Sequence, residues 1–132
     1  MVVTEPRIAV DLRLLAKLRG KLGEEAHVLE DGFKDACVEA IDECAAFGYD
    51  PTAWKAMINR HGAAEAARRL VVSGSFQDGF KRLLREGRLD LTVEFAILNP
   101  KWGRLFDSSH REAAWWRLER AMRDQSSVTE LT

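Results

Sequence analysis

Basic residues carry most of the chemistry that this sequence offers. Four arginines follow an acidic residue at a distance of four positions, a spacing that stabilises a helix by roughly 0.2–0.5 kcal/mol per pair. These pairs are Glu65–Arg69, Asp78–Arg82, Asp107–Arg111 and Glu119–Arg123. Other basic residues have no acid at this spacing, among them Arg68, Lys81, Arg85, Arg88, Lys101, Arg104, Arg117 and Arg120.

Several of these unpaired basic residues would form a phosphate-binding surface if the fold brings them together. Binding to DNA or RNA through such a surface weakens with salt in proportion to the number of phosphates contacted. We therefore select six candidate nucleic-acid-binding residues, which are Arg68, Lys81, Arg85, Arg88, Arg117 and Arg120. The alternative is that they are ordinary solubilising charges.

Trp116 and Trp102 are the two candidate interface residues. Trp115 and Trp116 are adjacent, so on a helix they differ by about 100° and cannot both face one core. Trp116 shares its face with Glu112 and Arg120, which favours contact with another subunit, a stacked arginine or a nucleic-acid base. Packing against the N-terminal helices is the alternative. Trp102, which follows Pro100 in a predicted loop, is the second candidate interface residue.

The residues that ligate metals or act as nucleophiles have unsuitable spacing. His27, His61 and His110 match no recognised metal pattern, and neither cysteine lies near a histidine as zinc sites require. Cys37 and Cys44 are seven residues apart in one predicted helix, which separates their Cα atoms by about 10 Å and excludes a disulfide. We expect both to be reduced core residues in a cytoplasmic protein.

No catalytic motif is present in the sequence. It contains no nucleophile elbow, phosphate-binding loop or Gly-rich dinucleotide fingerprint. Adjacent carboxylates such as Glu24–Glu25 point to different sides of a helix, so they are typical of a solvated surface. We therefore expect a protein that is not an enzyme, with no catalytic residues, no metal and no cofactor.

Length and charge indicate one soluble domain with an uneven charge distribution. The chain has 132 residues, of which 46% are hydrophobic and 31% charged, and no apolar run suits a membrane span or signal peptide. Residues 1–54 hold six basic and eleven acidic side chains, a net charge of −5, whereas residues 55–123 hold fourteen and eight, a net charge of +6. The basic half could meet phosphate, an acidic partner or the acidic half of a second copy.

Apolar spacing, caps and glycines predict seven helices. We expect the first six at 7–19, 24–47, 51–61, 63–72, 75–86 and 92–98, and the seventh from Ser109 onward. The predicted domain covers residues 1–123. A disordered polar tail is expected at 124–132. Asp50, Ser75 and Ser109 are the predicted N-caps. Gly20, Gly48, Gly62 and Gly87 are predicted helix stops.

The same spacing predicts the buried face of each helix. The expected core residues, in chain order, are Ile8, Leu12, Leu15, Leu18, Ala26, Leu29, Phe33, Cys37, Ala40, Ile41, Cys44, Trp54, Met57, Ile58, Ala63, Ala66, Ala67, Leu70, Phe76, Phe80, Leu83, Leu84, Ala114, Trp115, Leu118 and Met122. The fold class predicted from these elements is all-α: a compact bundle of six or seven mostly short helices, with one long helix in the N-terminal half.

The stretch "EGRLDLTVEFAILNP" at 86–100 alternates apolar and polar residues as a strand does, but no second segment could pair with it. Read as a helix over 92–98, it has Thr92 as N-cap, Glu94 in the first turn, and Phe95 and Leu98 on one face with Leu91. We predict this short buried helix, preceded by an extended connector.

Part of the sequence resembles a known bacterial region. The run from "GYDPTAWKAMINRHG" to "HREAAWWRLE", residues 48–119, resembles an uncharacterised helical region that recurs alone or at the C-terminus of bacterial proteins. The resemblance rests on three motifs: "DGF" at 78–80, "GRLDLTVE" at 87–94 and "LF" at 105–106. Some of those larger proteins look like HNH-type nucleases or other mobile-element and defence proteins. At most, the resemblance implies a helical module connected with nucleic-acid systems; this chain has no HNH metal-binding core.

Two functions from different classes follow from the sequence. The first is a nucleic-acid-binding module in which a helical hairpin at 63–86 approaches the backbone of DNA or RNA. The second is a protein-interaction or self-associating module, such as a homodimer, with Trp116 in the interface. Neither involves a membrane.

Overall fold

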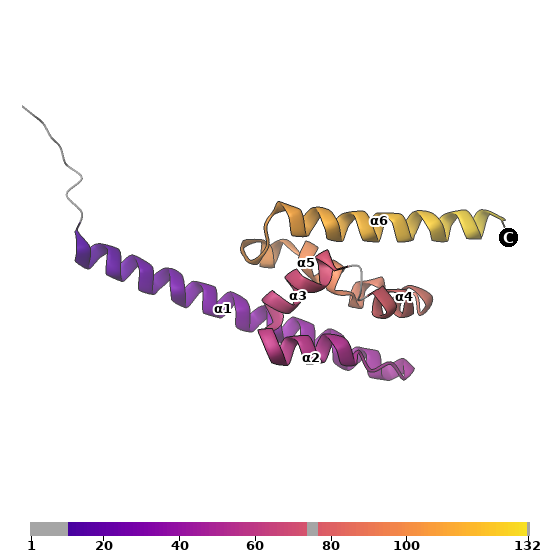
Figure 1. Cartoon of the computed structure of the whole chain (residues 1–132), viewed down its shortest axis with the longest axis horizontal. Coiled ribbons are helices and arrows are strands. Elements are labelled where there is room, and N and C mark those ends of the chain that lie inside the picture. Colours follow the sequence, from indigo (N-terminus) through magenta and orange to yellow (C-terminus); the bar gives the residue numbers. More distant parts are fainter. Residues whose placement is uncertain (1–10, 74–76, 132) are drawn as a thin grey trace, which may run out of the picture.

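The computed structural model describes residues 11–73 and 77–131, and it confirms the all-α prediction (Figure 1). The α-helices are α1 (Leu12–Cys44), α2 (Thr52–His61), α3 (Ala63–Val72), α4 (Gln77–Arg85), α5 (Val93–Leu98) and α6 (Ser108–Leu131). Short 3-10 helices are η1 (Ala45–Phe47), η3 (Leu89–Leu91) and η4 (Pro100–Leu105). Among the described residues no helix combines the length and apolar character that crossing a bilayer requires.

Helix α1 is one continuous helix of 33 residues, so the prediction of two helices separated at Gly20 was wrong. A glycine inside a helix costs about 1 kcal/mol relative to alanine, which is too little to end a helix that is capped and packed elsewhere. Asp11 is the N-cap, and its Oδ1 accepts hydrogen bonds from the backbone N–H groups of Arg13 at 3.0 Å and Leu14 at 3.2 Å.

The first half of α1 does not contribute to the core. Leu12, Leu15 and Leu18 were predicted to be buried, but their exposed fractions are 75%, 37% and 47%. Figure 1 shows the reason, because this half projects away from the other helices. Ala26 is also exposed. The predicted helix start and Ile8 lie outside the described residues.

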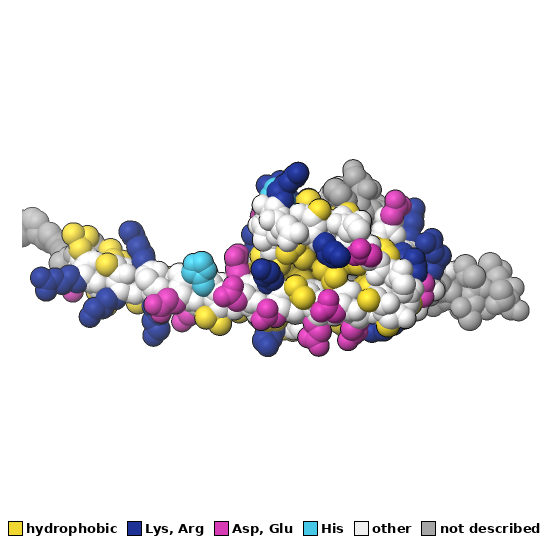
Figure 2. Space-filling model, turned by 90° about the horizontal axis from the view of Figure 1, so that it is seen from below, with side chains coloured by type: hydrophobic (Ala, Val, Ile, Leu, Met, Phe, Trp, Pro, Cys, Tyr) yellow, Lys and Arg dark blue, Asp and Glu magenta, His cyan; other side chains and the backbone are white. Residues whose placement is uncertain are grey.

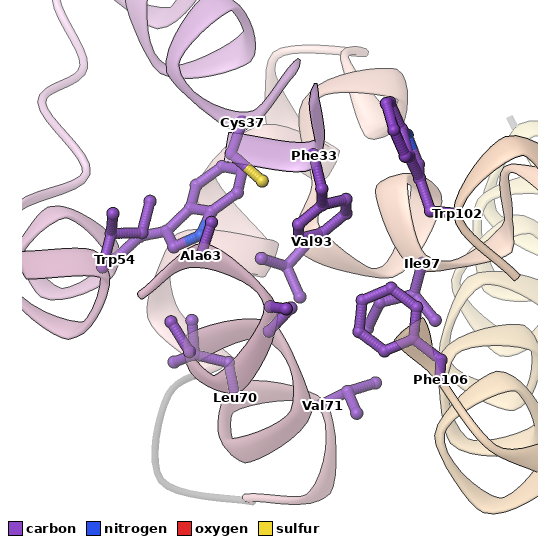
Figure 3. Packing of buried hydrophobic residues seen from close by; sticks show 14 of the residues in the cluster. Phe33, Cys37, Trp54, Ala63, Leu70, Val71, Val93, Ile97, Trp102 and Phe106 are labelled. Carbon is purple, nitrogen blue, oxygen red and sulfur yellow. The ribbon is translucent and has the colours of Figure 1, made fainter. Parts of the chain in front are cut away.

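The core forms around Phe33, which the second half of α1 places against η4 (Figure 3). The Phe33 ring meets Trp102 edge-on at a centroid distance of 5.9 Å, and Phe106 at 5.2 Å. Offset and edge-to-face aromatic pairs of this kind are favoured by the ring quadrupoles. Cys37 is fully buried beside them, as the sequence predicted, and both cysteines are free.

Helix α3 lies at the centre of the bundle because its side chains are small. Six of its ten residues are buried, and four of these are alanines, so α3 packs against α1, α2, α5 and α6. The predicted face of Ala63, Ala66, Ala67 and Leu70 is confirmed. Helix α2 precedes α3 and buries Trp54 and Ile58, and the turn between them is at Gly62, whose φ of 83° suits glycine.

Two of the predicted N-caps are replaced by other arrangements. Asp50 does not cap α2; its Oδ1 accepts a hydrogen bond from Lys55 Nζ at 2.8 Å, and Pro51 occupies the position before the helix. Asp107, not Ser109, caps α6, because its Oδ1 accepts the backbone N–H groups of Ser109 and His110. Hydrogen bonds from these two residues lower the pKa of Asp107. The predicted cap Ser75 and core residue Phe76 lie outside the described residues.

The stretch at 86–100 is helical, as predicted. Thr92 caps α5, and its Oγ1 accepts the N–H of Phe95 at 3.1 Å and donates to the carbonyl of Leu89 at 2.7 Å. The connector before it is not extended but forms η3, which buries Leu91. The buried residues of α5 are Val93, Glu94 and Ile97, whereas Phe95 faces solvent with 52% exposure.

Helix α6 differs from its prediction in rotation and in length. Ala114 and Leu118 are buried as expected, but Trp115 and Met122 are exposed and Ala121 is buried instead. The small Ala114 and Ala121 allow close contact with the neighbouring helices, which turns the larger side chains outward. The helix continues to Leu131, through the segment predicted as a disordered tail, since that segment contains no glycine or proline to end it.

The contact between Gly32 and Trp102 generates a prediction for stability. A Cβ at Gly32 would lie 2.9 Å from Cη2 of the buried Trp102 ring, so Gly32→Ala must displace the ring. We expect this variant to lose about 1–3 kcal/mol in urea unfolding. Gly23→Ala is the matched control in the same helix, because nothing lies within 4 Å of its added Cβ. An equal or higher urea midpoint for Gly32→Ala than for Gly23→Ala would contradict the prediction.

Candidate interaction surfaces

Arg117 of α6 connects three helices. Its Nη1 donates to Oε2 of Glu94 in α5, and the two side chains are only 15% and 6% exposed. Its Nη2 donates to the carbonyl oxygens of Val71 at 3.0 Å and Ser73 at 3.4 Å. These carbonyls lie at the C-terminal end of α3, where no further helical N–H can reach them. Arg117, a predicted phosphate ligand, therefore has structural partners on every side.

Two more of the predicted nucleic-acid-binding arginines are also engaged within the chain. Arg68 donates to Glu65 at 2.9 Å and to the carbonyl of Leu105 at 2.6 Å. Arg88 bonds to Glu43 of α1 at 2.8 Å and to both oxygens of Asp90, and its guanidinium lowers the pKa of Asp90.

The pairs predicted at a spacing of four are only partly formed. Glu65–Arg69 and Glu119–Arg123 are confirmed. Arg82 bonds to Glu86 instead of Asp78, and it donates to the carbonyl of Phe47 at 3.0 Å. Arg111 donates to the carbonyls of Gly103 and Phe106 instead of pairing with Asp107. Arg82 and Arg111 thus bind backbone carbonyls in or next to the 3-10 helices η1 and η4 instead of the acids predicted four residues before them.

Of the six predicted nucleic-acid-binding residues, Lys81 and Arg85 are the least engaged by other described groups of the chain. Both are exposed on α4, one helical turn apart, and neither has an ion pair with another described residue. Helix α4 packs against η3, and a pocket separates it from Leu70 of α3, so the predicted hairpin at 63–86 is open rather than tightly packed.

An exposed aromatic surface lies on α6. Trp115 and Trp116 are 56% and 59% exposed, and the sequence predicted this for Trp116 alone. The guanidinium of Arg120 lies 5.2 Å from the centre of the Trp116 ring, and a stacked arginine is one of the arrangements predicted for this tryptophan. We use the name aromatic surface for four residues: Trp115, Trp116 and Met122 of α6 and Leu98 of α5, which borders the tryptophans.

Trp102 is not part of any such surface. This second predicted interface residue is 5% exposed and packs against Phe33 in the core. The proline before it begins η4, and the tight turn of η4 directs the indole inward.

Both cysteine side chains are buried in the core. Burial raises the pKa of the Cys37 thiol to about 12, so this thiol stays protonated at neutral pH. Cys44 is buried, and its Sγ donates to the carbonyl of Ala40 at 3.3 Å. Within the described part of the chain no three His, Cys, Asp or Glu side chains cluster as a metal site would need.

A small pocket lies between α2, α3, α4 and α5. Its volume is about 160 Å³, and Tyr49, Trp54, Leu70 and Phe80 are among the residues that line it. Its buried carboxylate, Glu94, is already paired with Arg117, and its described lining contains no histidine or cysteine. The other titratable side chains of its described lining are Tyr49 and Asp78.

Comparison with known proteins yields no relative: no family model, curated protein or solved structure matches this chain. The resemblance of residues 48–119 to a recurring bacterial region stays a prediction.

The pairing of Arg117 with the buried Glu94 predicts a large loss of stability when Arg117 is removed. Arg117→Ala leaves the Glu94 carboxylate buried without its partner, and we expect a loss of about 3–5 kcal/mol in urea unfolding. Arg123→Ala removes an exposed pair with Glu119 on the same helix, so its loss should be below about 1 kcal/mol. Similar, small losses for both variants would show that the Arg117–Glu94 pair is not a structural constraint.

Proposed function

We propose that this protein is a non-enzymatic, helical interaction module that binds another polypeptide through the aromatic surface. The observation that supports this most directly is the exposure of Trp115 and Trp116 side by side on a helix whose opposite face is buried. Soluble proteins seldom leave adjacent large aromatic side chains uncovered unless the surface is used.

The composition of the aromatic surface suits a protein partner. Tryptophan and arginine are enriched among the residues that dominate binding energy, and Arg120 already lies over the Trp116 ring. Arg111, Glu112 and Glu119 border the two tryptophans and would form a polar rim of both charges. Burying each large apolar side chain contributes about 1.5–3 kcal/mol, so this surface could anchor a specific contact.

Site-specific crosslinking tests the proposal. A photo-crosslinking amino acid in place of Trp116 should produce, on irradiation in cells that contain the partner, a covalent species heavier than the 14.9 kDa chain. The same amino acid in place of Val72 is the matched control, because Val72 is 63% exposed but lies on α3. Crosslinking at neither position, or equally at both, would argue against the aromatic surface as a binding site.

Nucleic-acid binding is the second candidate, and Lys81 and Arg85 favour it. These two exposed cations concentrate positive charge on one side of α4. They lie within residues 55–123, which carry a net charge of +6. Arg68, Arg88 and Arg117 contribute less to this candidate because their guanidinium groups have partners within the chain. A contact centred on α4 would involve few phosphates and would depend strongly on salt.

Fluorescence anisotropy with labelled duplex DNA, single-stranded DNA and RNA tests this second candidate. Lys81→Glu combined with Arg85→Glu should weaken binding at low salt by about tenfold or more if α4 contacts phosphates. Lys55→Glu combined with Arg60→Glu makes the same change of charge on α2 and should have a smaller effect. No binding at low salt, or equal effects of the two double variants, would exclude α4 as a nucleic-acid site.

A further inference from the structure

The buried face of α1 continues beyond the packed body. Phe33 and Cys37 mark this face in the core, and Leu29 is partly buried at its edge. At helical spacings of three, four and seven residues the same face continues toward the N-terminus as Leu22, Leu18 and Leu15. Their exposed fractions are 61%, 47% and 37%, and no described residue of the chain covers them. We call Leu15, Leu18, Leu22 and Leu29 the leucine stripe.

Charges divide α1 into two segments of opposite sign. The basic segment, residues 13–21, contains Arg13, Lys17, Arg19 and Lys21 and no acid. The acidic segment, residues 24–43, contains eight acidic side chains and one basic side chain, Lys34. Figure 2 shows basic side chains toward the projecting end of α1 and acidic side chains nearer the body.

We propose that the projecting half of α1 binds the projecting half of α1 from a second copy of this chain, in antiparallel orientation. The leucine stripes of the two copies would cover each other, as apolar seams do between paired helices. The charge distribution selects the orientation. An antiparallel pair places each basic segment beside the start of the other copy's acidic segment, whereas a parallel pair places like charges together.

This arrangement is self-complementary and therefore closes as a two-fold dimer. Each copy gives the same stripe and the same charges to the contact, which is the requirement for a symmetric pair. The exposed part, residues 12–28, is about 25 Å long, so the contact involves few leucines. We accordingly expect a weak dimer that depends on protein concentration and on salt.

Analytical ultracentrifugation over a range of protein concentrations tests the leucine stripe. The wild-type mass should rise from 14.9 kDa toward twice that value, and Leu18→Ser with Leu22→Ser should raise the dimer dissociation constant by about tenfold or more. Val38→Ser is the control, because Val38 is 40% exposed on the other side of α1 and should not affect the mass. Circular dichroism shows whether the serine variant keeps its helices.

A charge exchange tests the electrostatic part. Replacing the four basic residues of the basic segment with Glu should abolish the dimer. Replacing Glu24, Glu25, Glu30 and Asp31 with Lys in that same variant should restore it, because the two segments have then exchanged signs. A dimer that survives the first set of changes, or fails to return with the second, would overturn the proposed charge pairing.

The orientation is measured with a spin label on Arg13→Cys. Both native cysteines are fully buried, so the label attaches to the new thiol. In an antiparallel dimer the two labels lie at opposite ends of the contact, more than about 20 Å apart. In a parallel dimer they would be side by side, and a short distance would overturn the proposal.

This inference extends the proposed interaction role but uses a different surface, so the two can fail separately. A wild-type protein that stays monomeric at every concentration overturns the α1 pairing. Crosslinking from position 116 to a different polypeptide would still support the aromatic surface in that case. The dimer could instead persist in the Leu18→Ser, Leu22→Ser variant and be lost with Trp116→Ala. That result would show that self-association occurs through α6, and it would overturn the α1 pairing.

Discussion

The partly buried guanidinium of Arg117 is the constraint on which the arrangement of α3, α5 and α6 depends. It neutralises Glu94, a carboxylate that would be costly to bury alone, and it completes the hydrogen bonding at the end of α3. This contact, together with the close packing of Ala114 and Ala121, sets the rotation of α6, because all three side chains point inward. With α6 in this rotation, Trp115 and Trp116 are directed outward and form the exposed aromatic surface.

The same use of arginine recurs elsewhere in the bundle. Arg68, Arg82 and Arg111 each donate to a carbonyl oxygen at the end of a short helical segment. Short helices leave many such carbonyls without a partner, and a long planar donor can reach them across a loop. The positive charge of residues 55–123 therefore has a structural role in a fold made of many helix ends, and the net charge of a segment overstates the cations available to an external ligand.

Local features of the fold could be predicted from the sequence, and long-range features could not. The cap at Thr92 and the small-residue face of α3 depend on residues within one or two turns, so their spacing was sufficient. The contact between Glu94 and Arg117 joins residues 23 positions apart and requires the packed bundle. In the candidate site, the exposure of Trp116 was predicted, but from an argument that placed Trp115 in the core, and the exposure of Trp115 was not predicted. The burial of Trp102 was not predicted either, because it depends on Phe33 from α1. Leucine periodicity predicted an amphipathic face in the first half of α1, but periodicity cannot indicate whether the covering surface belongs to the same chain.

The unequal surroundings of α1 give its two halves different thermodynamic behaviour. The second half is held by the core, and it supplies the nucleus from which the helix extends toward the N-terminus. In the described residues the projecting half is held mainly by backbone hydrogen bonds, with the Asp11 cap at its start and one exposed ion pair between Glu25 and Arg104 near the body. It also includes Gly20 and Gly23, and glycine is a poor helix former. Its turns should therefore unfold from the N-terminal end of α1 while the bundle stays folded. Their backbone amides should exchange with solvent much faster than those near Phe33. Ordering this half on contact with a partner costs conformational entropy. A substitution that raises its helix propensity would therefore lower this cost and strengthen binding, even if the substituted residue is outside the contact surface.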